Sequence, residues 1–202
     1  GDAEAASGSD DQPKRSDDEE EPLPPIDPGA VTIHDVEAGE VNQKSGGGGG
    51  GGGGLGPTGP VDHEKSDRRQ REIGRRGEQA AFDAELKRVE AAGFDPSAVV
   101  WRAKRNPLAP YDIESIDTDG QRIFIEVKAT TGDDPSEPFV ISQSELLQAL
   151  RHRSRFYIYR VTQTTTASPV VHRYQDPARL LGEGRADLGL SDANMRLGAE
   201  VN

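Results

Sequence analysis

The stretch Tyr111–Lys128, YDIESIDTDGQRIFIEVK, decides the fold. Residues 111–113 and 123–127 are rich in β-branched and aromatic side chains, and the turn-forming sequence Thr-Asp-Gly lies between them. This pattern predicts two antiparallel strands joined by a tight turn. Side chains alternate between the two faces of a strand, so Glu126 and Lys128 share one face of the second strand.

The length of the turn decides whether the acidic residues of the two strands meet. With a three-residue Thr-Asp-Gly loop whose glycine is left-handed, Asp112 lies directly opposite Glu126. The same register pairs Asp117 with Gln121. A two-residue loop would place the two acids on opposite faces. Carboxylates that face each other repel and need a compensating cation, for which Lys128 and a divalent metal are both candidates.

The sequence around this hairpin predicts one domain over residues 66–182 with the element order α-β-β-β-α-β-β. The first helix is expected from about Arg68 to Ala92, capped by Ser66 or Asp67 and ended by Gly93. The other expected elements are a strand over 98–103, the hairpin, a polar loop over 130–138, a helix from the capping box of Ser142 and Glu145 through His152, strands over 155–162 and 169–174, and a short helix after Asp176.

Both predicted helices carry apolar stripes that we expect to face the core. In the second helix the stripe consists of Leu146, Leu147 and Leu150. Glu78 precedes Phe82 by one turn and continues the stripe of the first helix, so its carboxylate is either paired or functional. The stripe of the first helix consists of Ile73, Gly77, Ala81, Phe82, Leu86 and Val89.

The segment 1–62 differs in composition from the rest of the chain. It carries 14 acidic and 3 basic residues, so -11 of the total charge of -12 lies there, and it includes the glycine run 46–54. We interpret it as a disordered linker, with an acidic interaction tail as a weaker alternative. The strand-like residues 31–33 could be a docking motif, although a solvated linker is favoured. Residues 183–202 are weakly patterned and form a tail.

The absence of cysteine excludes disulfides and cysteine zinc sites. No segment has the pattern of a signal peptide or a membrane span, so the cytoplasm is the expected location and no membrane partner is expected. The chain begins with glycine, which indicates a fragment of a longer protein.

The acids of the hairpin predict a metal site. Mg²⁺ prefers oxygen ligands and commonly takes one or two carboxylates, here Asp112 and Glu126, to which the Val127 carbonyl would add a third oxygen. Such a metal would polarise a phosphodiester and lower the pKa of a bound water. Lys128 would orient that water or stabilise charge on phosphorus, and Glu78 would complete the metal shell or orient the water.

Each of these residues has a simpler interpretation when it is taken alone. An acid–hydrophobe–lysine triplet is common in exposed salt bridges, and Glu78 could pair with Arg75 or Arg76. The same arginines, with Arg151 and Arg153, are candidates for contacts to nucleic-acid phosphates, or else lie on solvated helical faces. The conjunction of the acids and the lysine in this element order favours a functional site.

Five segments resemble the C-terminal domain of NO VEIN-type proteins, grouped with the PD-(D/E)xK nuclease-like superfamily. The resemblance covers about residues 71–181, and Ala129 departs from it where a hydroxyl residue is more usual. The segments are Ile73–Glu78, Tyr111–Ile113, Ile125–Thr131, Pro138–Ser142 with Glu145, and Tyr157–Val161.

The resemblance implies an α/β (α+β), restriction-endonuclease-like core with a mixed sheet flanked by helices. It maps the superfamily's metal acids onto Asp112 and Glu126, its lysine onto Lys128 and its helical glutamate onto Glu78. It also implies a place at the C-terminus of a larger restriction or phage-defence protein with an ATPase or helicase part. We therefore expect a Mg²⁺-dependent nuclease, with Mn²⁺ as a substitute and DNA as the substrate. The alternative is a catalytically silent module that binds nucleic acid or a partner protein.

Overall fold

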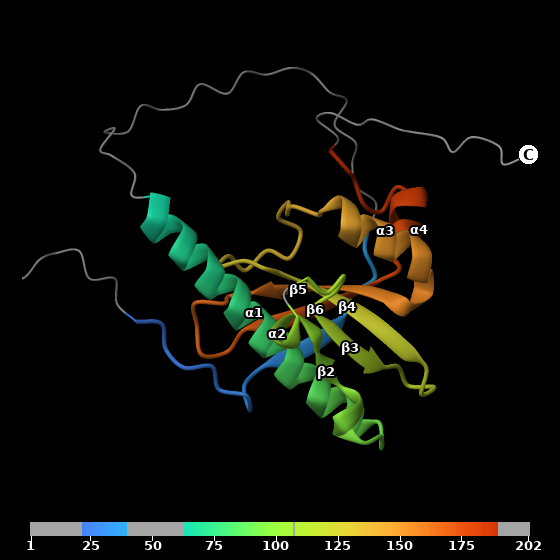
Figure 1. Ribbon diagram of the computed structural model, residues 1–202, viewed down its shortest axis with the longest axis horizontal. Coiled ribbons are helices and arrows are strands. Elements are labelled where there is room, and N and C mark those ends of the chain that lie inside the picture. The colour runs from blue at the N-terminus through green and yellow to red at the C-terminus, as the bar shows by residue number, and fades with distance from the viewer. Residues whose placement is uncertain (1–21, 40–62, 107, 190–202) are drawn as a thin grey trace, which may run out of the picture.

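The computed structural model describes residues 22–39, 63–106 and 108–189, which form a mixed six-stranded sheet flanked by helices (Figure 1). The strand order is β1-β6-β5-β4-β3-β2, in which the pairs β1–β6 and β4–β5 are parallel and the others antiparallel. The strands are β1 (Thr32–Asp35), β2 (Val100–Trp101), β3 (Ile113–Ile116), β4 (Arg122–Ala129), β5 (Phe156–Thr162) and β6 (Val170–Gln175). The helices are α1 (His63–Ala91), α2 (Arg102–Arg105), α3 (Gln143–His152) and α4 (Pro177–Gly182). The expected α/β architecture is confirmed.

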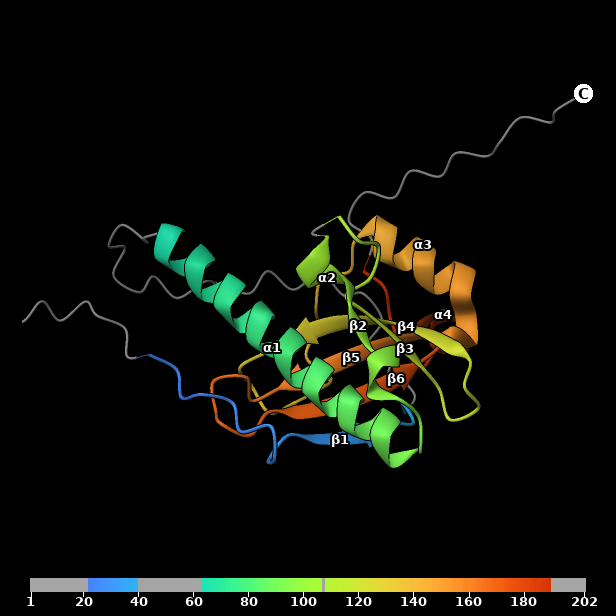
Figure 2. The same ribbon diagram turned by 60° about the horizontal axis from the view of Figure 1, so that its bottom comes forward.

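The two faces of the sheet have separate cores. Ile123, Ile125 and Val127 of β4 pack in one apolar cluster with residues of α1. Phe124, between them in sequence, packs instead with Ala149 of α3. Alternation along β4 therefore places α1 on one face and α3 with α4 on the other, as the turned view in Figure 2 shows.

The register of the β3–β4 hairpin is the one expected for a three-residue loop. Gly120 has a φ of 76°, in the left-handed region that favours glycine. The Asp117 N–H donates to the Gln121 carbonyl at 2.7 Å, and Ile113 pairs with Ile125. The residues just beyond that pair, Asp112 and Glu126, therefore stand opposite each other, which confirms the prediction.

Helix α1 starts at His63, before the expected caps, and ends as expected at Gly93 with a φ of 83°. The Phe94 N–H donates to the Val89 carbonyl at 3.1 Å and closes the helix end. Gly77 faces β4 at its closest approach, since a Cβ there would lie 2.5 Å from the Cβ of Ala129. A larger residue at position 77 would therefore push α1 away from the sheet.

The predicted strand over 98–103 is wrong in length. Only Val100 and Trp101 form β2, and Arg102 begins the short helix α2. The N–H groups of Arg102 and Ala103 both donate to the Asp112 carbonyl, at 2.7 and 3.0 Å. Two donors converging on one carbonyl turn the chain out of the sheet at this point.

The predicted burial of the α3 leucines is wrong for two of them. Leu147 and Leu150 are 52% and 51% exposed, whereas Ala149 is fully buried. Residues four apart share a helix face, and Glu145 and Ala149 form the face turned to the sheet. Leu147 lies on the opposite side of the helix and Leu150 beside it, so an acid and an alanine occupy the place expected for the apolar stripe.

The interpretation of residues 1–62 as a disordered linker is wrong for the part that the structure describes, residues 22–39. Here β1 adds to the sheet edge, with Thr32 paired to Val170 and Asp35 to Arg173. The Arg173 guanidinium donates to the Asp35 carboxylate at 2.6 Å. Pairing to β6 and this ion pair fix a segment whose composition indicated a linker. Residues 1–21, 40–62 and 190–202 lie outside the described residues.

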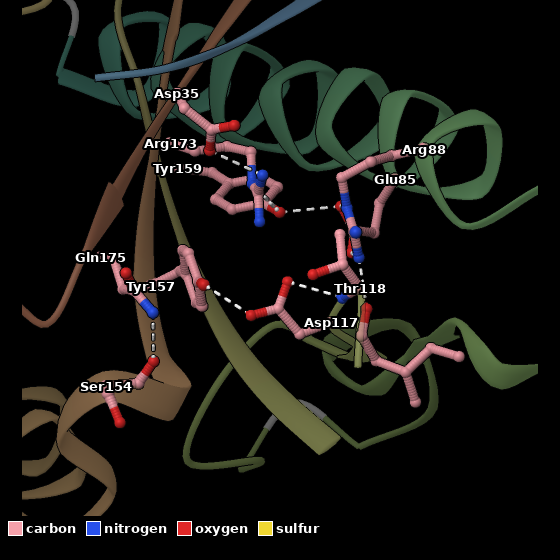
Figure 3. A network of polar contacts seen from close by, with 11 residues as sticks. Asp35, Glu85, Arg88, Asp117, Thr118, Ser154, Tyr157, Tyr159, Arg173 and Gln175 are labelled. Atoms are coloured by element: carbon pink, nitrogen blue, oxygen red, sulfur yellow. Dashed lines mark hydrogen bonds and ion pairs between the residues drawn. The ribbon is translucent and has the colours of Figure 1, made fainter. Parts of the chain in front are cut away.

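A buried polar network on the α1 face joins the helix to the sheet (Figure 3). The Tyr159 hydroxyl donates to Glu85 at 2.7 Å and accepts from Arg173 at 2.9 Å, and Glu85 also accepts two hydrogen bonds from Arg88. Glu85 and Tyr159 are both 0% exposed. Arg173 extends the network to Asp35 of β1. Tyr159 thus connects α1, β5, β6 and β1, and sequence analysis identified none of these contacts.

We predict that Tyr159→Phe lowers the free energy of unfolding by about 1–3 kcal/mol, because it removes a hydroxyl that serves two buried charged groups. Urea denaturation measures the change. The matched control is Tyr174→Phe on the other face, where the tyrosine is only half-buried. An equal loss in both variants would show that the network contributes no more than an ordinary tyrosine hydroxyl.

Candidate metal and catalytic site

The β3–β4 pair places two acids at one end of the sheet. Glu126 is 6% exposed and stands opposite Asp112, which lies just before β3. The Val127 N–H donates to the Asp112 carboxylate at 2.8 Å, which fixes that carboxylate against β4. The N–H and C=O of one strand residue point to the same neighbour, so the Val127 carbonyl is directed to the same side as Asp112.

Lys128 lies between two carboxylates. Its Nζ is 3.0 Å from Glu126 Oε1 and 2.7 Å from Glu145 Oε2. Glu145 also closes the capping box of α3, accepting from the Ser142 N–H at 3.0 Å. The helix start that the sequence predicts therefore delivers a further acid to the site.

Sequence analysis assigned Glu145 only to this cap and missed its contact with Lys128. The capping box already explained an acid at this position. Glu145 and Lys128 are 17 positions apart, a separation that carries no spacing signal joining them. The adjacent serine and the helix start were the available clues, and they gave the local role alone.

Burial and like charges raise the pKa of both strand acids. Burial and, after it, the neighbouring Asp112 charge raise the pKa of Glu126 to about 8, although Lys128 opposes both effects. Burial also raises the pKa of Asp112 to about 6, against the lowering effect of the Val127 N–H. For Lys128, burial acts to lower the pKa, but Glu126 and Glu145 outweigh it and raise the pKa. Lys128 thus compensates the two strand acids only in part.

The donor set fits a hard divalent cation. Asp112, Glu126, Glu145 and Lys128 together comprise three acids and one base, so a further cation is favourable here. Two carboxylates and the Val127 carbonyl match the few protein oxygens that Mg²⁺ takes beside water and phosphate. No group of three or more His, Asp or Glu side chains with metal-binding geometry occurs within residues 22–39, 63–106 and 108–189. The arrangement suits Mg²⁺ sharing its ligands with a substrate better than a closed protein cage.

Glu78 reaches the same end of the sheet from α1. Its Oε2 accepts the indole N–H of Trp101 at 2.8 Å. Its charge is among the causes that raise the pKa of Asp112. The structure brings together Asp112, Glu126 and Lys128, three of the four residues singled out from the sequence, and places Glu78 on α1 bound to Trp101. The pairing of Glu78 with an arginine is replaced by a pairing with Trp101.

The four arginines proposed as phosphate contacts fall into two groups. Arg76 donates to the carbonyls of Thr164 and Thr166 at 2.7 and 2.9 Å and so fixes the β5–β6 loop. Arg153 lies 3.9 Å from Asp176 in an ion pair. Arg75 and Arg151 are exposed on α1 and α3. Phosphate contact stays a prediction for all four, and Arg75 and Arg151 are the better placed.

The geometry defines the class of the protein as a mixed α/β domain that has paired acids and a lysine at one end of its sheet. Comparison with known families gives a more specific likeness for part of the chain. Residues 77–174 match the model of the family described as Protein NO VEIN, C-terminal, and the four candidate residues lie inside this match. No curated protein and no solved structure matches the chain significantly. None of the helices in the described residues is long and apolar enough to cross a membrane.

We predict that Glu126→Gln stabilises the metal-free protein at pH 8 by about 1–2 kcal/mol. A carboxyl whose pKa is raised on folding holds its proton longer in the folded state, so the wild type loses stability as pH rises from about 4.5 toward 8. The glutamine of the variant does not titrate, so the variant does not lose this stability as pH rises. Thermal unfolding in EDTA across this range measures the difference, and the gain should vanish at pH 4.5. Parallel pH profiles for the two proteins would contradict the burial of an uncompensated charge.

Proposed function

We propose that this domain is a Mg²⁺-dependent nuclease that hydrolyses phosphodiester bonds, with DNA as its substrate and Mn²⁺ as a substitute metal. The observation that carries the proposal is the position of Asp112 and Glu126. They lie opposite each other, both have raised pKa values, and Lys128 lies beside them on the same strand. A purely structural site gains nothing from the repulsion between a buried and a partly buried carboxylate.

Each residue has a distinct role in the proposed reaction. Asp112, Glu126 and the Val127 carbonyl would hold the metal, which when bound polarises the phosphodiester and lowers the pKa of a nucleophilic water. Lys128 has three ammonium donors: Glu145 accepts a hydrogen bond from it at 2.7 Å, and Glu126 forms an ion pair with it at 3.0 Å. A remaining donor would contact a phosphate oxygen or the water, where it would stabilise developing negative charge.

Glu78 would orient the attacking water. One of its oxygens accepts the Trp101 N–H, which fixes the carboxylate while the second oxygen stays able to accept. Burial of Trp101 against Phe82, with ring centroids 5.3 Å apart, holds the indole in place. A carboxylate that is held through one oxygen while the other oxygen can still accept a hydrogen bond is suited to aligning a water molecule.

The cellular setting extends the proposal. The matched family is described as the C-terminal part of protein NO VEIN. This description supports a place for the domain at the C-terminal end of a larger protein. We propose that this larger protein works in the cytoplasm, carries an ATPase or helicase part and functions in restriction or phage defence, with the domain as its nuclease.

A second candidate function is a catalytically silent module that binds nucleic acid or a partner protein. The observation in its favour is that Lys128 is bound by two acids and Glu78 by Trp101. Such internal pairing would make the cluster a structural network. Metal binding separates the two candidates, since a silent module has no need of it.

We predict metal-dependent cleavage of plasmid and single-stranded DNA by the wild type. Asp112→Asn and Lys128→Ala should each reduce the rate at least about a hundredfold, because each removes a group that acts in the transition state. Asp133→Asn, in an exposed loop, is the matched control and should cleave normally. Mg²⁺ should also raise the melting temperature of the wild type more than that of Asp112→Asn.

Other outcomes discriminate among the alternatives. DNA binding without cleavage or metal-dependent stabilisation would support the silent module. Cleavage that survives both substitutions would place the active site elsewhere.

A further inference from the structure

A cleft of about 410 Å³ opens beside Lys128 at the end of β4. Its walls come from four segments: the first half of α1 at Ile73, the end of β4, the loop residues Phe139 and Val140, and β5 at Arg160. The volume is in the range of sites that hold one small ligand. Lys128, the proposed catalytic lysine, lines the cleft, so the cleft lies next to the proposed reaction site.

A buried cation lies under this cleft. Arg160 is 3% exposed, pairs with Lys128 across β4 and β5, and lines the cleft. Its guanidinium donates to the carbonyls of Lys128 and Glu137 at 3.2 and 3.3 Å, and no hydrogen bond of its Nε is found in the part of the chain that the structure describes.

The neutralisation of Arg160 is incomplete. The Glu137 carboxylate lies 3.8 Å from it, is 45% exposed, and accepts a shorter hydrogen bond of 2.7 Å from Thr130. A charge held mainly by neutral carbonyls retains positive potential, which favours an anionic ligand above it.

An aromatic ring lies at the rim of the cleft. Phe139 is 40% exposed, and the Arg160 guanidinium lies 5.3 Å from the ring centroid on one face. The neighbouring Val140 is 86% exposed. A ring backed by a guanidinium and open to solvent resembles the stacking platforms on which proteins bind unpaired bases.

We propose that this cleft binds one unpaired nucleotide of the substrate strand, with the base stacked on Phe139 and the phosphate attracted by Arg160 and Lys128. The proposal rests on the proposed nucleic-acid function and specifies its substrate class. In a duplex both faces of each base are covered by neighbouring base pairs, so Phe139 can stack only on a base that is single-stranded, terminal or flipped out. The domain therefore acts on single strands, frayed ends or unpaired positions in preference to intact duplex.

The test measures binding apart from cleavage. The full chain carrying Asp112→Asn is titrated in EDTA with a short oligothymidine strand that holds a central 2-aminopurine, alone and annealed to its complement. We expect tighter binding of the single strand, with quenching of the 2-aminopurine fluorescence on stacking. Phe139→Leu keeps an apolar side chain but removes the ring, and it should weaken single-strand binding about tenfold and abolish the quenching.

Two control variants are added to the same background. Phe139→Tyr retains the ring and should retain both affinity and quenching. Leu147→Ala alters an apolar residue on α3 outside the cleft that is 52% exposed, against 40% for Phe139, and should change nothing. Unchanged binding in Phe139→Leu, equal affinity for the duplex, or absence of single-strand binding would each overturn the proposal.

Cleavage assays keep this proposal distinct from the nuclease proposal. A wild type that binds the single strand through Phe139 but never cuts it would support the nucleotide site and refute the nuclease. A nuclease whose cutting of single strands is the same in Phe139→Leu and in the wild type would establish the nuclease and refute the nucleotide site.

Discussion

The repulsion between Asp112 and Glu126 is the constraint on which the rest of the structure depends. The Thr-Asp-Gly loop, with Gly120 at a φ of 76°, fixes the register that sets them opposite each other. Burial then makes this pairing costly, as the raised pKa values of both acids record. A fold that retains such a pair needs stabilisation elsewhere, and functional sites are where proteins hold this kind of strain.

That stabilisation lies on the opposite face of the sheet. Glu85 and Tyr159 are fully buried there, and the hydrogen bonds between them and to Arg88 and Arg173 each involve a charged group (Figure 3). The close approach of Gly77 to Ala129 sets α1 against β4 and thereby brings Glu78 to the site. The α1 face thus holds the helix in place, and the α3 face supplies Glu145. The division lets one sheet combine a stable core with a strained end.

Local sequence patterns predicted the hairpin, but they failed for the elements whose positions depend on residues far away in the sequence. The β3–β4 register depends on a few neighbouring residues, so turn chemistry was sufficient to predict it. The edge strand β1 depends on Arg173, 138 residues from Asp35, and Glu85 meets Tyr159 across 74 residues. No periodicity joins such partners. The α3 leucines failed for a related reason, since the face turned to the sheet was fixed by the contact of Glu145 with Lys128.

The position of Lys128 reconciles the two candidate functions. Without metal, it compensates Glu126 and is held by Glu145 at 2.7 Å. A divalent cation among the strand acids would take over the compensation of Glu126, because its charge is larger and its oxygen ligands are already directed to it. Glu145 would then remain the partner that keeps the ammonium at the site and near the cleft. The pairing of Lys128 with Glu145 is therefore compatible with both candidate functions. In the metal-free protein it forms part of a structural network, and in a metal-loaded protein it would hold the lysine in position before substrate binds.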